Sequence, residues 1–473
     1  MTTATDLTEL TVTESARLIA ARQLSPVELT RALLDRIGEV GGPLAAFTTV
    51  HVDDSLAVAR AAETMLGAGY RLGPLHGVPI AVKDNVAVAG RVTSAGSRIL
   101  ADWVPEEDAT VATRLKGAGA NLIANTNMHE FAWGATSENP HYGCVRNPWD
   151  TTRIASGSSG GSGAAVAAGA VPAALGTDTG GSIRLPSSAN GIVGIRPTIG
   201  RVSNAGIIPL AWSLDTCGPM TRTVEDCALL LGLLAGHDPA DPGTSRCTVP
   251  DYTASLREGV RGLRVGVIRD HALTQVQPVV RAATERALAT LESLGAEIVD
   301  IRIPDIEGNV SALMTVESSE PSAYHQRWLR ERPDDYGENV RFMFEQGELY
   351  LATHYIQAQR YRRLLRDRFL AAFQRSVDVV AMPTIPFTAP AVGTETIELE
   401  PGVVQPTLVA IMRYTGLASL TGMPALSLPS GFDDDGLPIG LQLMGAPFAE
   451  ARLFQAGHAF EQATDFHVRR PAL

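Results

Sequence analysis

Short apolar runs alternate along this chain with longer segments in which apolar residues recur every three or four positions. The runs that have the length of buried strands are residues 78–82, 121–124, 173–176, 263–268, 296–303 and 377–382. The longer segments that have the helical period are residues 53–66, 109–117, 223–235 and 276–294. Strands that alternate with helices in this way predict an α/β fold rather than an all-α or all-β one.

Local signals sharpen two of these regions. Residues 13–40 predict two helices, the second with Ser25 as its N-cap, Pro26 in its first turn and Glu28 completing a capping box. Residues 263–303 predict a strand–helix–strand unit that lies on the main sheet or follows it. The other local predictions are mostly helical structure at residues 310–375 and a β-hairpin at residues 425–444.

The most unusual stretch is residues 155–198, which holds two serine-bearing glycine clusters around an Ala/Val-rich run. The clusters are residues 157–161 and residues 180–182. Glycine lets a backbone approach a ligand closely, and a serine among free N–H groups at a helix entrance is a candidate nucleophile. A flexible Gly/Ser linker is the other interpretation, but linkers do not continue into AAVAAGAVPAALG.

Ser182 follows the predicted strand at residues 173–176, at the start of a predicted short helix. The backbone N–H groups of Thr179, Gly180, Gly181 and Ser182 would then be free to converge on one point, as an oxyanion hole requires. A glycine turn that merely reverses the chain is the alternative. A serine nucleophile also needs a base to take its proton.

No histidine pattern supplies that base. The string His129–Trp133 misses the HExxH metal motif because Trp133 stands in place of the second histidine. The four cysteines have no metal-ligand spacing either, so we expect no metal. Lys83 ends an apolar run, and burial there would lower its pKa towards neutrality. A solvated surface lysine is the alternative interpretation.

Several long motifs, in the same order and spacing, resemble the amidase signature family. They are GVPIAVKDN (77–85), GSSGGSGAAVAAG (157–169), GTDTGGSIRLP (176–186), GIVGIRPTIGRVS (191–203) and SLDTCGPMTRTVEDC (213–227). The resemblance covers nearly the whole chain and is weakest between about residues 245 and 375. It implies a large mixed β-sheet covered by helices on both faces.

The resemblance also implies a catalytic triad of Ser182, Ser158 and Lys83. Ser182 would form an acyl-enzyme, and Ser158, preceded by a cis peptide bond, would relay the proton to a neutral Lys83. The family usually has Pro-Gly before the conserved glycine, where this chain has Ala-Ser before Gly157. Because Gly157 is kept, we expect the cis geometry to survive. Asp178 and Arg184 are expected to orient the loop rather than react.

The segment at residues 125–137 lines the acyl pocket in that family. Here it offers Met128, Phe131 and Trp133 and no cation. This predicts hydrolysis of the C–N bond of a small amide, anilide or carbamate, as in aryl acylamidases and urethanases, with no cofactor. A core position for Trp133 is the alternative.

Three other functions stay open. Residues 157–161 satisfy GxSxG, so Ser159 could be an α/β-hydrolase nucleophile, although residues 150–153 are too polar for the strand that this elbow needs. The amidase subunit of a glutamine-dependent tRNA amidotransferase usually carries a glutamine where this chain has Leu185, and a YDG motif that is absent here. These departures favour a stand-alone amidase. A non-catalytic scaffold is the third alternative, disfavoured because all three triad positions are present.

We expect one domain over residues 1–473, because no internal repeat or linker divides the chain. Its expected parts are a helical segment (1–70), a catalytic core (71–245), a variable lobe (246–375) and a C-terminal return to the core sheet (376–473).

Charge and composition narrow the partners. The formal net charge of −12 predicts neither nucleic-acid nor membrane binding. The sequence has no apolar run of about 18 residues, and its first ten residues lack the features of a signal peptide. Four cysteines without a pairing pattern suit free thiols in a reducing compartment. We therefore expect a cytoplasmic protein, and the resemblance allows a homodimer.

Overall fold

An 11-stranded mixed β-sheet runs through the computed structural model, which describes residues 6–473. In spatial order its strands are β1 (Phe47–Val50), β3 (Asn121–Thr126), β2 (Pro79–Lys83), β8 (Ala173–Asp178), β10 (Thr216–Thr221), β9 (Val193–Arg196), β16 (Ala425–Phe432), β17 (Pro438–Gly445), β13 (Val379–Pro383), β11 (Arg264–Val267) and β12 (Glu297–Asp300). Strand β2 is parallel to β3 and β8, whereas β10 is antiparallel to both of its neighbours. The α/β fold with a large mixed sheet is therefore confirmed.

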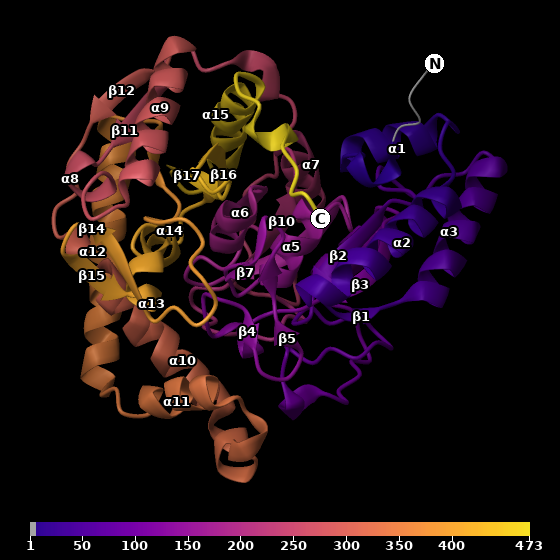
Figure 1. Ribbon diagram of the computed structural model, residues 1–473, viewed down its shortest axis with the longest axis horizontal. Helices are drawn as coiled ribbons and strands as arrows, with labels where there is room; N and C mark the ends of the chain where they lie inside the picture. The colour runs from indigo at the N-terminus through magenta and orange to yellow at the C-terminus, as the bar shows by residue number, and fades with distance from the viewer. Residues whose placement is uncertain (1–5) are drawn as a thin grey trace.

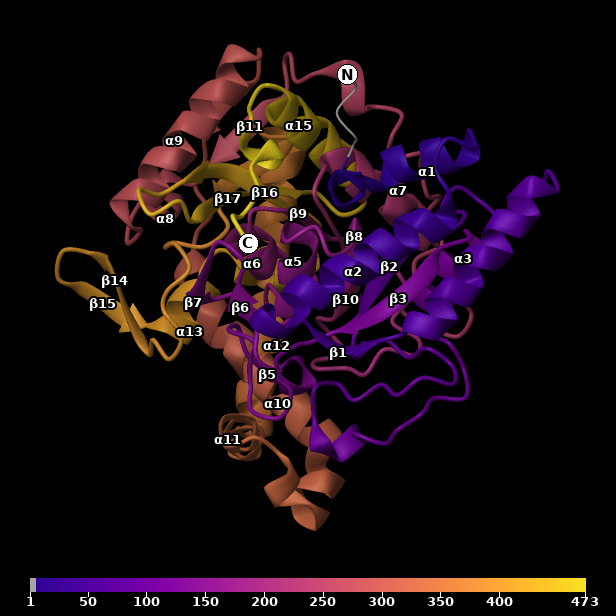
Figure 2. The same ribbon diagram turned by 45° about the vertical axis from the view of Figure 1, so that its right-hand side comes forward.

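Helices pack on both faces of this sheet (Figures 1 and 2). The α-helices are α1 (Val12–Ala20), α2 (Pro26–Leu44), α3 (Val52–Gly67), α4 (Thr110–Gly117), α5 (Gly160–Ala167), α6 (Arg184–Asn190), α7 (Val224–Leu234), α8 (Arg269–Ala272), α9 (Pro278–Ser293), α10 (Asn309–Glu331), α11 (Glu338–Gly347), α12 (Ala352–Arg375), α13 (Thr407–Ile411), α14 (Thr415–Thr421) and α15 (Glu450–Gln462). Helices α5 and α6 pack together on the middle strands, and α7 packs with α15 over the same strands. In both views α10 and α11 extend beyond the edge of the sheet.

The local predictions hold with one exception. Strands β11 and β12 are parallel and joined through α9, and β16 and β17 form the expected hairpin. The Ser25 hydroxyl accepts hydrogen bonds from the N–H groups of Val27 and Glu28, so it caps α2. Among the described residues, the reciprocal bond from the Ser25 N–H to the Glu28 carboxylate is not made, while the Ser25 hydroxyl also donates to Glu63 on α3. The cap thus links two helices.

Strand β10 is a central strand that the sequence pattern missed. It carries Gly218 and Pro219, two residue types that are depleted in strands. A Cβ atom on Gly218 would collide with the carbonyl oxygen of Ile195, so the close approach of β9 requires glycine there. Packing against the neighbouring strand overrides local propensity. Strand β9, strand β1 and the separate hairpin of β14 (Thr396–Glu400) and β15 (Val403–Pro406) were also missed.

All four expected parts of the chain contribute strands to the one sheet, while the division itself stays a prediction. All four cysteines are free thiols. Among residues 6–473, no helix combines the length and apolar character needed to cross a membrane. The first five residues, part of the segment on which the absence of a signal peptide was judged, lie outside the described residues.

A buried ion-pair network ties the middle of the sheet to α6. Asp178, the last residue of β8, accepts hydrogen bonds from Arg184 at 2.8 Å and from Arg196 at 2.9 Å, with all three side chains fully buried. Burial alone would raise the pKa of Asp178, but the two guanidinium groups more than compensate and hold it well below the usual range. The network therefore keeps a full negative charge in the interior.

We predict that Asp178→Asn, which keeps the shape of the side chain and removes its charge, lowers the free energy of unfolding by about 3–5 kcal/mol. The reason is that two buried guanidinium groups lose their counter-charge. Urea unfolding monitored by circular dichroism measures the loss. Glu331→Gln, which breaks an exposed pair with Arg327, is the control and should cost less than about 0.5 kcal/mol. Equal losses in the two variants would contradict the prediction.

Candidate active site

Lys83 is a fully buried amine in the middle of the sheet. It ends β2, and its Nζ donates hydrogen bonds to Ser158 Oγ at 2.7 Å and to Thr177 Oγ1 at 2.8 Å. Burial lowers its pKa from 10.5 to about 7, because the more distant carboxylates of Asp215 and Asp178 only partly offset the loss of water. A neutral amine is thus available near neutral pH. The surface interpretation of Lys83 is excluded.

The peptide bond between Gly157 and Ser158 is cis, as expected. Ser156 lies in the Ala-Ser segment that replaces the family's Pro-Gly before this bond. It adopts a left-handed conformation with φ of 61°, and its hydroxyl donates to the carbonyl oxygen of Ala135 at 3.0 Å. The Ser158 carbonyl oxygen in turn accepts from the backbone N–H of His129 at 3.1 Å. These contacts hold the Ser158 hydroxyl beside Lys83.

Ser182 lies in the loop between β8 and α6, next to the Ser158 loop. The N–H of Ser159 donates to the Ser182 carbonyl oxygen at 3.2 Å, which joins the two glycine-rich loops. Ser182 is 7% exposed, and within residues 6–473 its hydroxyl has no hydrogen-bond partner. The hydroxyl is therefore free to meet a ligand.

The backbone around Ser182 presents unused donors. Across the described residues, the N–H groups of Thr179, Gly180, Gly181 and Ser182 donate to no protein acceptor. Just beyond them, the N–H of Ile183 donates to Asp178 Oδ2 at 3.1 Å. The Asp178 network thus fixes both ends of a loop whose N–H groups remain available, as the proposed oxyanion hole needs.

Ser159 has the environment of a structural residue. It is fully buried, its Oγ donates to the Thr177 carbonyl oxygen at 3.2 Å, and the Thr177 N–H donates back to it at 3.3 Å. The preceding strand, β7 (Asp150–Ile154), pairs with β6 (Arg146–Asn147) and bridges to Ala391 through Arg153, and it lies outside the main sheet. The α/β-hydrolase interpretation therefore lacks both a free nucleophile and the strand that would present it.

A cavity of about 20 Å³ adjoins Ser182. Its lining residues are Ala132, Trp133, Gly134, Ala135, Gly180, Gly181, Ser182, Leu185, Leu210, Glu317, Leu408 and Met412. Trp133 lines this cavity and also belongs to the buried aromatic core, so its role in binding stays a prediction. Apolar side chains make up most of the remaining wall, so the cavity favours small, largely apolar parts of a ligand.

Two other expected pocket residues, Met128 and Phe131, are core residues instead. Both are buried, and the Phe131 ring lies 4.3 Å from the His325 ring in an aromatic cluster that also holds Tyr336 and Phe344. The expectation failed because residues 130–132 form a 3₁₀ turn with Phe131 at φ of 49°, so neighbouring side chains do not share one face.

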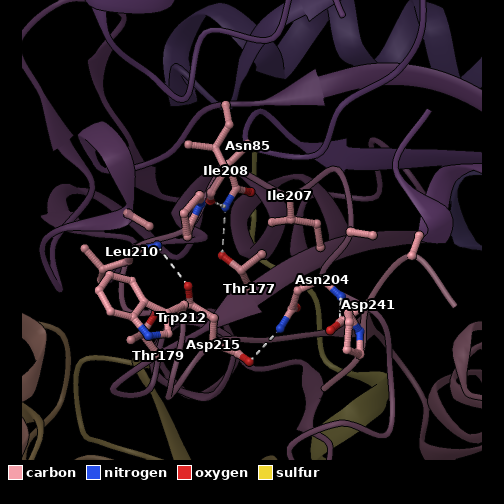
Figure 3. Close-up of a pocket in the computed structure, with 15 residues that line it drawn as sticks. Asn85, Thr177, Thr179, Asn204, Ile207, Ile208, Leu210, Trp212, Asp215 and Asp241 are labelled. Atoms are coloured by element: carbon pink, nitrogen blue, oxygen red, sulfur yellow. Dashed lines mark hydrogen bonds between the residues drawn. The ribbon is translucent and has the colours of Figure 1, made fainter. Parts of the chain in front are cut away.

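A second cavity, of about 260 Å³, shares the lining residues Ala132 and Leu210 with the cavity beside Ser182. Figure 3 shows the residues that line this second cavity. Thr177 contacts Lys83 and also accepts from Asn85 Nδ2 at 3.2 Å. Asp215 accepts from the Leu210 N–H at 2.9 Å, and burial raises the pKa of Asp215 to about 6. Thr177, which lines this cavity and bonds to Lys83, thus connects the cavity to the candidate base.

Sequence reasoning missed three of these side chains. Thr177 and Asn85 lie inside the quoted motifs and were passed over, although their positions beside Lys83 and Ser182 could have drawn notice. Glu317 lies in the helical segment that showed no chemistry, and no local pattern marks it.

Comparison with known proteins shows the family to which this chain belongs. The sequence model of the Amidase family matches residues 28–454. The chain belongs to this family, whose members act on C–N bonds. The A subunit of the glutamyl-tRNA(Gln) amidotransferase from Moorella thermoacetica is 42% identical over 99% of both chains.

Solved structures of amidase relatives show the same fold. A chain from a study of a vestigial protein complex and the evolutionary origins of an s-triazine catabolic enzyme is 39% identical, with a TM-score of 0.92 over 98% of this amidase and 100% of that chain. The A subunit of the glutamyl-tRNA(Gln) amidotransferase from Thermotoga maritima is 32% identical, with a TM-score of 0.81 over 97% and 96%.

These relatives correct two expectations. Leu185 and the missing YDG motif favoured a stand-alone amidase for small amides, anilides or carbamates, yet relatives at about 40% identity over 98–99% of the chain are amidotransferase subunits. The residues at a few loop positions reflect local side-chain contacts and do not show whether a chain assembles with partner proteins. The expectation of no nucleic-acid partner is also wrong for these relatives, since their name includes a tRNA. The net charge of one chain does not describe the assembly to which a subunit belongs.

We predict that Gly161→Ala disrupts the Ser158 loop. A Cβ atom there would collide with the carbonyl oxygens of Asn127 and Ala46, both of them backbone atoms that cannot move independently. We expect the rate at which a fluorophosphonate labels Ser182 to fall by at least about 100-fold, as displacement by about 1 Å does at other sites. Gly38→Ala is the control, because open space surrounds that helical glycine. It should leave labelling unchanged and stabilise α2 slightly. Normal labelling of Gly161→Ala would refute the close-approach argument.

Proposed function

We propose that this chain is the amidase component of a glutamine-dependent tRNA amidotransferase type of assembly, in which Ser182, Ser158 and Lys83 release ammonia from the amide donor. The observation that carries the proposal is the buried contact of 2.7 Å between Lys83 Nζ and Ser158 Oγ, beside a serine whose loop presents free N–H groups. The names of full-length relatives support the assembly.

The first step is attack by Ser182 on the amide carbonyl carbon of the donor. Neutral Lys83 takes the proton of Ser158 as Ser158 takes the proton of Ser182, so the attacking oxygen never becomes a free alkoxide. The carbonyl oxygen gains negative charge and accepts hydrogen bonds from the N–H groups of residues 179–182. A serine relay suits this role because a hydroxyl both donates and accepts.

Collapse of the tetrahedral intermediate then breaks the C–N bond. Lys83, now an ammonium, returns its proton through Ser158 to the leaving nitrogen, which departs as ammonia and leaves an acyl ester on Ser182. A water molecule passes a proton to the same relay, attacks the ester carbonyl, and restores the Ser182 hydroxyl while the carboxylic acid leaves. One amide and one water thus become one carboxylic acid and one ammonia.

We predict that phenylmethanesulfonyl fluoride modifies the wild-type chain once, at Ser182. Ser182→Ala should abolish the adduct, and Lys83→Ala should slow its formation by at least about 100-fold, because a serine without its base is a weak nucleophile. Intact-protein mass spectrometry with peptide mapping measures both effects. Ser182→Ala should also abolish ammonia release from glutamine by the chain together with its co-purified partner proteins. An adduct at Ser159, or ammonia release that survives Ser182→Ala, would refute the assignment.

The pKa of Lys83 gives a second prediction. Burial lowers it from 10.5 to about 7, so the base is mostly protonated below pH 7 and mostly neutral above it. The rate of Ser182 acylation should rise about tenfold from pH 6 to a plateau above pH 8, with its midpoint near 7. Stopped-flow acylation with a reagent that is itself insensitive to pH measures the profile. Lys83→Arg should lose the plateau, because arginine stays protonated. A wild-type profile that is flat or falls with pH would contradict this base.

A further inference from the structure

Glu317 on α10 is a buried carboxyl group with no partner. It is 2% exposed, and within residues 6–473 it makes no hydrogen bond and no ion pair. Glu320, one turn later and also 2% exposed, accepts from Ser213 Oγ at 2.6 Å and from the Tyr355 hydroxyl at 2.7 Å. Buried polar groups are normally hydrogen-bonded, as Glu320 is, so the bare carboxyl of Glu317 needs an explanation.

The Glu317 carboxyl faces the nucleophile loop. A Cβ atom placed on Gly180 would lie 2.5 Å from Glu317 Oε1, so glycine is needed for the carboxyl to reach this backbone. Glu317 lines the same cavity as Gly180, Gly181 and Ser182. Among the described residues that line it, Glu317 is the one ionisable side chain. A ligand on Ser182 would therefore meet this carboxyl.

No protein cation neutralises Glu317. Its pKa is raised to about 8, first by burial and then by the negative charges of Asp215 and Asp178, while Arg196 and Arg184 lower it only in part. Both arginines already bond to Asp178. Glu317 therefore lacks the counter-charge that a buried carboxylate requires.

We propose that Glu317 binds an amino group of the amide donor, so that the preferred donor is a primary amide carrying an ammonium group. This inference rests on the proposed function of Ser182. An ammonium supplies both the missing positive charge and N–H donors, and charge-assisted hydrogen bonds of this kind are about twice as strong as neutral ones. The cavity offers no cation for a carboxylate on the donor. The amino group, not the carboxylate, is then the recognised feature.

The present cavity of about 20 Å³ holds little more than a water-sized group, so a donor displaces part of its wall. Leu408 lies on the short helix α13 and Met412 directly follows it. Both side chains are flexible and apolar, whereas Glu317 is fixed on the long helix α10. Binding would move the apolar wall and leave the carboxyl in place.

The test measures how well four matched amides protect Ser182 from phenylmethanesulfonyl fluoride. Glutamine carries an amino group and a carboxylate, γ-aminobutyramide only the amino group, glutaramate only the carboxylate, and butyramide neither. In the wild-type assembly we expect the two amines to protect at concentrations at least about tenfold lower than the other two, as one charge-assisted contact warrants. Glu317→Gln, with its protection measured against its own labelling rate without an amide, should lose this preference.

Glu320→Gln is the matched control on the same helix. It breaks contacts to Ser213 and Tyr355, so it should lower the melting temperature and keep the preference for amines. Glu317→Gln should not lower the melting temperature, because its carboxyl has no partner to lose. An equal preference in wild type and Glu317→Gln, or no preference in wild type, overturns the inference and leaves the nucleophile assignment standing. A wild-type Ser182 that resists labelling overturns the proposed function and this inference with it.

Discussion

The carboxylate of Asp178 organises three distant parts of the chain around one loop. It ends β8, accepts from the backbone at the start of α6, and pairs with Arg184 and Arg196. Arg184 also donates to the carbonyl oxygen of Thr415 at 2.8 Å and to Ser419 Oγ at 2.9 Å, both on α14. Because these contacts hold both ends of the loop, the backbone of residues 179–182 keeps its shape without using its own N–H groups. The ion pairs are thus the support for the free donors, not part of the chemistry.

Ionisable groups in this interior have been driven to opposite states by their surroundings. Asp178 has two cations and stays charged, whereas Lys83 has only hydroxyl partners and its pKa falls to about 7. Glu317 has no partner, and its pKa rises to about 8. The proposed hydrolysis and donor selection would use one base made neutral and one acid without a cation, close to the loops of Ser158 and Ser182. Environment, and not residue type, assigns these roles.

The sequence revealed the groups whose signal is local. Ser182 lies in a contiguous glycine-rich string and Lys83 ends a recognisable strand, so both could be proposed from the residues themselves. The role of Ser158 and the cis peptide bond before it came from the resemblance of their motif to the amidase signature family. Glu317 could be proposed from neither, because its significance depends on Gly180, which is 137 positions away, and on the absence of any partner. Phe131 and strand β10 failed for a related reason: tertiary packing decided the direction of one ring and the strand state of a Gly-Pro segment. No local sequence pattern indicated partner proteins. Only the names of full-length relatives did so.

Different segments of the chain supply the candidate triad and the proposed donor contact. Strand β2 holds the base, the loop between β7 and α5 holds Ser158, and the loop after β8 holds Ser182, all within the motifs that resemble the amidase signature family. The one ionisable group that reaches the nucleophile from outside this core comes from α10, in the region where the resemblance is weakest. A change at one position of α10 alters what meets the loop at Gly180 without moving β2, β8 or the Asp178 network. The proposed donor contact and the candidate triad are therefore supplied by different elements that meet at the cavity, so the first can be changed by substitution without rebuilding the second.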